Sequence, residues 1–165
     1  GIDLALREGR GDLPGMIVKP LAASRILLCA SPEYLQRCGT PQVANDLLSH
    51  QALLYEHVVL DRRWRLSLNE QSFILQPQGR LSSDNYDLLL AACLAGQGVL
   101  DCPHWSVQPL LASGRLVQLL PDYQIAPDAF GPLLLAVYPS HRRATRKVQA
   151  FIEFIEAYLA ARQLA

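Results

Sequence analysis

RILLCASPEYL, residues 25–35, is a continuous apolar run that ends at a serine followed by a proline. An apolar run without alternating polar residues is typical of a strand that is buried on both faces of a sheet. Ser31 can accept a hydrogen bond from the first free amides of a helix, and Pro32 suits the first helical position. The stretch therefore predicts a central strand over residues 25–30, followed by a capped helix from Pro32 to about Cys38.

Strands and helices alternate along the rest of the chain. A second wholly apolar run, residues 133–138, predicts another buried strand. The clearest helix follows Leu81 and is capped by Ser83, Asp84 or Asn85, and a last helix covers residues 145–162. Other strands are predicted near residues 2–7, 16–18, 52–55, 64–68, 73–75, 79–81, 99–100 and 116–120, with a helical turn at 45–49 and a further helix over 106–112. This order indicates an α/β fold with its central strands covered on both faces.

The composition excludes several classes of protein. Lysine plus arginine and aspartate plus glutamate both number 15, so the formal net charge is +0, whereas a free-standing DNA-binding module shows a basic excess. The four cysteines, Cys29, Cys38, Cys93 and Cys102, form no CxxC pair, so we expect buried free thiols in a cytoplasmic protein. No apolar run is long enough to span a bilayer, so we expect no membrane partner.

The sequence contains no motif of a common catalytic or cofactor site. A Gly-rich phosphate loop, HExxH and GxSxG are all absent from it. Cys102 and His104 are potential metal ligands, but a convincing third ligand is missing. We therefore expect no enzyme activity, no cofactor and no metal.

Five segments follow one another at characteristic spacings. They are DLALREG (residues 3–9), CASPEYL (29–35) with Gly39, Pro41, Asp46, Leu47 and His50, residues 81–98, GRLV to LPD (114–122), and VYP (137–139) with KVQAFI (147–152). Together they resemble the effector-binding domain of the LysR-type transcriptional regulators, over nearly the whole chain. The family often has Asn-Asp after the strand at Leu81, where this chain has Asp84-Asn85, and either order can cap a helix.

The resemblance implies a two-lobed, periplasmic-binding-protein-like (type II) α/β fold in which lobe I is incomplete. Lobe I would hold residues 1–28 and 138–165, and lobe II would hold residues 29–137. The family's winged helix–turn–helix, its linker helix and the opening part of lobe I have no counterpart in the sequence. On this resemblance we expect the chain to be a fragment of a longer protein.

The same resemblance implies a function in regulation. A small-molecule effector, an organic acid or an aromatic compound, would bind between the two lobes and thereby control transcription. The partners would be a second copy of the chain, as a homo-oligomer, and DNA only through the absent winged helix–turn–helix. A small enzyme, a free-standing solute-binding protein on the same fold and a pure interaction domain are the alternatives. We also expect self-association, through an exposed stripe that includes Phe151, Ile152 and Ile155.

The polar residues that follow the predicted strands are the candidate site residues. Ser82, Ser83 and Asp84 either contact the effector or only cap the next helix, and Ser31 has the same two alternatives. The predicted effector-binding residues are Ser31, Ser82, Ser83, Asp84, Asp101, Cys102, Pro103, His104 and Arg7.

Three of these predictions have a structural alternative. The residues from Asp101 to His104 either line the cleft or form a loop whose carboxylate bonds nearby amides. Arg7 pairs either with an acidic effector or with a neighbouring carboxylate in a salt bridge. For His50, which matches a family histidine, we favour a hydrogen-bonded structural role.

Overall fold

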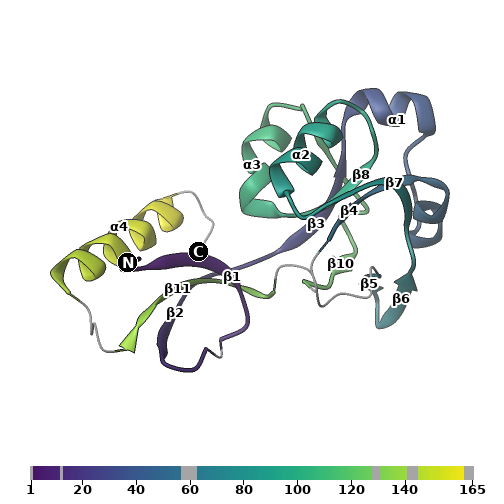
Figure 1. The fold of residues 1–165 in the computed structure, drawn as a ribbon. Coiled ribbons are helices and arrows are strands. Elements are labelled where there is room, and N and C mark those ends of the chain that lie inside the picture. Colours follow the sequence, from purple (N-terminus) through teal and green to yellow (C-terminus); the bar gives the residue numbers. More distant parts are fainter. Residues whose placement is uncertain (1, 12, 57–62, 128–130, 141–144, 162–165) are drawn as a thin grey trace. The chain divides into compact units, whose positions relative to one another are not determined.

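The computed structural model describes residues 2–11, 13–56, 63–127, 131–140 and 145–161. Its contacts divide the chain into two compact units: Gly1–Ser24 with Phe130–Ala165, called unit 1, and Arg25–Ala129, called unit 2. The elements of each unit are labelled in Figure 1.

Unit 1 is a three-stranded antiparallel sheet with one helix packed along it (Figure 1). The strands β1 (Ala5–Gly9), β11 (Leu133–Pro139) and β2 (Met16–Ala23) pair in that order. The helix α4 (Arg146–Ala161) buries Val148, Ile152 and Leu159 in a core that it shares with this sheet. These side chains share one face of the helix because they recur at helical spacing.

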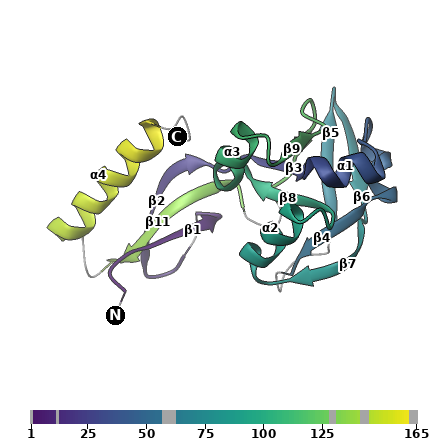
Figure 2. The ribbon, with the colours of Figure 1, turned by 90° about the horizontal axis from the view of Figure 1, so that it is seen from above.

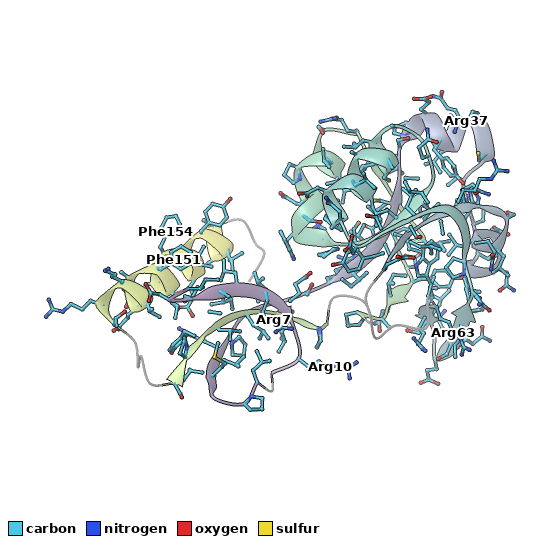
Figure 3. The ribbon with its side chains drawn as sticks, in the orientation of Figure 1. Arg7, Arg10, Arg37, Arg63, Phe151 and Phe154 are labelled. Carbon is cyan, nitrogen blue, oxygen red and sulfur yellow. The ribbon has the colours of Figure 1, made fainter. Side chains whose placement is uncertain are left out.

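A face of α4 beside this buried face carries exposed aromatic side chains, and we call it the aromatic face. Phe151, Phe154 and Tyr158 are 42%, 62% and 43% exposed. Figure 3 shows Phe151 and Phe154 on the side of α4 that points away from the sheet. The expectation that Ile152 and Ile155 would be exposed was wrong: Ile152 is buried and Ile155 is half-buried, because both lie on the helix face that packs on the sheet.

Unit 2 is built on an eight-stranded mixed sheet. Its strands are β3 (Ile26–Ala30), β4 (Gln51–Tyr55), β5 (Trp64–Leu68), β6 (Gln71–Leu75), β7 (Gln78–Ser83), β8 (Val99–Pro103), β9 (Val117–Leu119) and β10 (Gln124–Ile125). They follow the order β6–β5–β10–β3–β8–β4–β7, and β9 pairs with β3. All five residues of β3 are buried, which confirms the predicted central strand.

Successive residues of β3 point into two separate cores. Leu28 and Ala30 pack with α1 (Pro32–Cys38), with the 3₁₀ helix η1 (Ala44–Ser49) and with the β5–β6 hairpin. Leu27 and Cys29 instead pack under α2 (Tyr86–Leu94) and α3 (His104–Ala112). The views in Figures 1 and 2 both show α2 and α3 as neighbours. The two cores explain why this strand needs apolar side chains on both faces.

Strand pairing sets the division between the two units. β3 pairs only with strands of unit 2 and β11 only with strands of unit 1, as far as the described residues go. The lobe limits taken from the resemblance are 28/29 and 137/138, whereas the division between the units falls earlier, at 24/25 and at 129/130. Those limits stay a prediction.

Candidate functional site

Polar side chains gather where the parallel strands of unit 2 end. β4 pairs in parallel with β7 and with β8, and Tyr55 lies opposite Ser83 in this register. Because parallel strands end at the same side of a sheet, the last residues of β4, β7 and β8 form one edge, which we call the carboxyl edge. The structure thus brings the end of β7 and the end of β8 to one edge.

Ser82 and Ser83 end β7 and make different contacts. The Ser82 hydroxyl donates to Oε1 of Glu56 at 2.8 Å. The Ser83 hydroxyl accepts from the amide of Asn85 at 3.0 Å. Asp84 is exposed and does not cap α2, because the Asn85 side chain takes that role by accepting from the Leu88 amide at 3.2 Å.

The first turns of α2 and α3 are joined at this edge. The hydroxyl of Tyr86, the first residue of α2, lies 2.7 Å from Oγ of Ser106 in the first turn of α3. The amides of both first turns have no partner within the helix. The contact therefore holds two helix N-termini, each favourable to a negatively charged group, beside one another.

His104 begins α3 beside a basic residue. Its amide donates to the carbonyl oxygen of Arg25 at 2.8 Å, so the start of β3 reaches the same edge. Burial, and then the positive charge of Arg25, lower the pKa of His104. Pro103 before it is buried, and its carbonyl accepts from the Ser106 hydroxyl at 2.7 Å. Arg25 is exposed, so its charge is available to a ligand.

Asp101 and Cys102 point to opposite faces of β8, because side chains alternate along a strand. Cys102 lies in the core under α2 and α3, with its Sγ 3.4 Å from Sγ of Cys29. Asp101 is buried, and burial raises the pKa of its carboxyl to about 6, although bonds from its own amide and from Trp64 favour the charged form. We leave Cys102 out of the proposed site because its side chain faces the core.

Two predicted residues are not part of the carboxyl edge of unit 2. Ser31 is 3% exposed and caps α1 by accepting from the Tyr34 amide at 3.3 Å, as predicted. Since β3 runs antiparallel to β8, Ser31 lies at the other end of the strands, so we leave it out of the proposed site. Arg7 lies in unit 1, exposed on β1, and its Nε donates to the carbonyl oxygen of Glu8 at 3.4 Å.

His50 has the structural role that we favoured. Its Nδ1 lies 3.1 Å from the hydroxyl of Tyr34, and the ring is buried. Burial lowers the pKa of His50, with a smaller opposing effect from Asp46.

The sequence did not single out Arg25, Tyr86 or Ser106 as site residues. Arg25 opens an apolar strand, and only the antiparallel pairing of β3 with β8 brings it to His104. Tyr86 and Ser106 each follow a predicted strand end, and that position was the one available signal for them.

Two kinds of feature are absent from the described residues. No helix among them is both long enough and apolar enough to cross a membrane. In the same residues, no three side chains of histidine, cysteine, aspartate or glutamate are grouped as metal ligands.

The chain is similar to regulators of known family. Residues 1–160 match the family described as "LysR substrate binding domain". The chain is 33% identical over 165 residues to the HTH-type transcriptional regulator DmlR of Escherichia coli, covering 97% of this chain and 51% of that protein. It is 31% identical over 158 residues to the HTH-type transcriptional activator TtdR of the same species, covering 95% of this chain and 49% of that activator. The chain therefore spans about half the length of these two relatives.

Solved structures agree with this similarity. The regulatory domain of CrgA, a LysR-type transcriptional regulator from Neisseria meningitidis, matches with a TM-score of 0.82 and 29% identity, over 96% of this chain and 76% of that one. The regulatory domain of AphB from Vibrio vulnificus matches with a TM-score of 0.72 and 26% identity, over 94% and 75%. The fold is thus the two-lobed, periplasmic-binding-protein-like α/β fold of those domains.

Proposed function

Since this chain belongs to the LysR substrate binding domain family, we propose that it binds a small organic acid at the carboxyl edge of unit 2. The observation that carries the proposal is the hydrogen bond between Tyr86 and Ser106, which holds the first turns of α2 and α3 together. Relatives of this chain are named as transcriptional regulators and not as enzymes, which supports a sensing role over catalysis.

The charges at the carboxyl edge favour one position for the acid group. Ser82 is already bonded to the carboxylate of Glu56, so a second negative group beside it would be repelled. The start of α3 instead combines the positive end of the helix dipole with the charge of Arg25 near His104. We place the acid group of the effector there, with Ser83 as a further hydrogen-bonding group.

The function of the whole protein is part of the proposal. Effector binding would favour one arrangement of the regulator over another and so change how it acts on DNA. DNA would be read by a winged helix–turn–helix outside the 165 residues, in a cytoplasmic protein. Because the net charge is +0, we expect these residues alone to bind DNA only weakly.

A homo-oligomer is also proposed, with the aromatic face of α4 as its contact. Phe151, Phe154 and Tyr158 are each exposed by two fifths or more, and aromatic side chains of this kind are enriched at protein interfaces. Light scattering over a concentration series tests this part. The mass should exceed that of a monomer, and Phe154→Ser should lower it, whereas an exposed change outside α4, Val43→Ser, should not.

A thermal-shift screen tests the proposed function as a whole. Small organic acids should include a compound that raises the unfolding temperature, because a ligand that binds only the folded state stabilises it by mass action. Aromatic compounds without an acid group are the matched comparison. If only these stabilise the chain, the proposed chemistry of the carboxyl edge is wrong.

A further inference from the structure

A pocket opens at the other end of the strands of unit 2. It has a volume of about 550 Å³ and lies where β4 and β7 begin, beside the last turn of α1 and the loop that follows α2. Its polar lining consists of Tyr34, Arg37, Cys38, Gln51, Arg80 and Gln97. β4 starts at Gln51 and ends at Tyr55, so this pocket and the carboxyl edge lie at opposite ends of the same strand.

A β-bulge places Arg80 in this pocket. Gly79 and Arg80 of β7 together lie opposite the single residue Ala52 of β4. Such a bulge bends the strand and changes the direction of its side chains. It requires glycine at position 79, because a Cβ there would lie 1.8 Å from the carbonyl oxygen of Ala52. Among the described residues, Arg80 has no ion-pair partner.

Arg37 also lines the pocket, and two contacts hold its guanidinium in place. Its Nη2 donates to the carbonyl oxygen of Gly96 at 2.7 Å, and its Nη1 lies 3.4 Å from the carboxylate of Glu33. The guanidinium has five N–H donors, so these two contacts leave others for a ligand. Figure 3 marks Arg37 on α1.

We propose that this pocket binds a small oxyanion, a carboxylate or a phosphate group, between Arg37 and Arg80. Two guanidinium groups line it, and their forked geometry suits the paired oxygens of these anions. The described residues that line the pocket include no aspartate or glutamate. Gln51 and Gln97 add side-chain amides, which can donate further hydrogen bonds to the anion. The inference goes beyond the proposed function, since it concerns a different part of unit 2.

Cys38 provides a direct reporter of occupancy, because it lines the pocket and is exposed while the other three cysteines are buried. The experiment measures how fast iodoacetamide, a neutral reagent, alkylates Cys38 in the 165-residue chain. Inorganic phosphate and succinate are the two probes, each compared with sodium chloride at equal ionic strength. We expect saturable protection by one or both probes, and the more effective probe identifies the phosphate or the carboxylate as the preferred group.

Arg80→Gln should raise the half-protecting concentration about tenfold, the loss expected for one charge-assisted hydrogen bond. Arg115→Gln, which removes an exposed arginine of unit 2 outside the pocket, should leave it unchanged. Ser83→Ala should also leave it unchanged, which separates this site from the proposed effector site. The proposal is overturned if neither probe protects Cys38 beyond sodium chloride, or if Arg115→Gln weakens protection as much as Arg80→Gln.

Discussion

The hydroxyl of Tyr86 lies 2.7 Å from Oγ of Ser106, and this contact joins the first turns of α2 and α3. The Ser106 hydroxyl donates its own hydrogen to the carbonyl oxygen of Pro103. The phenol of Tyr86 must therefore donate in the contact with Ser106. Burial is the main cause that raises the pKa of Tyr86, so the phenol keeps the proton that it donates.

Removal of this hydrogen bond should destabilise unit 2. We predict that Tyr86→Phe lowers the free energy of unfolding by about 1 kcal/mol, the usual net value of one hydrogen bond. Urea titration of Tyr86→Phe, Ser106→Ala and the double variant isolates the contact. The two losses should be less than additive by about 0.5–1.5 kcal/mol, because both single variants remove the same bond. Fully additive losses would mean that the two hydroxyls do not interact.

Asp101 should make stability depend on pH. Burial raises the pKa of its carboxyl from an ordinary 3.8 to about 6, so the fold favours the protonated form. The contribution of protonated Asp101 to the stability of the fold is fully present below pH 3.8 and is lost as pH rises through about 6. The stability that is lost between pH 4 and pH 7 corresponds to about 2 kcal/mol.

Urea titrations of the unchanged chain and of the Asp101→Asn variant at several pH values check this prediction. The difference in unfolding free energy between the unchanged chain and this variant should fall as pH rises from 4 to 7. A difference that stays constant over this pH range would show that the carboxyl of Asp101 titrates with its ordinary pKa.

The cysteines should differ sharply in reactivity. Cys29, Cys93 and Cys102 are buried, and Cys38 is exposed. A hydrogen bond with a neighbouring thiol, Cys102 for Cys29 and Cys29 for Cys93, is the main cause that raises the pKa of these two cysteines, and burial adds to it. Because the thiolate is the reactive form, we predict that iodoacetamide labels one thiol of the folded chain and four in urea. Mass spectrometry gives the count, and fast labelling of a second thiol in the folded chain would contradict the packing of β3.

Local signals in the sequence predicted much of the fold. The uninterrupted apolar run of β3, with Ser31 and Pro32 after it, fixed both the strand and the start of α1. The apolar residues that recur along α4 likewise predicted a long helix. They did not show that Ile152 lies in the core and Phe151 at the surface. Strand β10 was not predicted, because Gln124 and Ile125 have partners only through pairing with β3 and β5.

The candidate site was harder to predict because it depends on strand direction. Ser31 and Ser83 both follow strands and precede helices, yet the antiparallel course of β3 places them at opposite ends of the sheet. Arg25 reaches His104 for the same reason. The opposite directions of Asp101 and Cys102 follow from the two-residue repeat of a strand. The sequence predicted this strand only near residues 99–100, whereas β8 extends to Pro103.

Calorimetry of the Ser83→Ala variant with an organic acid identified by the thermal-shift screen tests the central claim most directly. Loss of one hydrogen bond to a charged group should weaken binding by about 1.5–3 kcal/mol. Ser113→Ala, which changes an exposed serine at the end of α3, is the matched control and should bind as the unchanged chain does. An unchanged dissociation constant for Ser83→Ala would contradict the assignment of the carboxyl edge as the effector site.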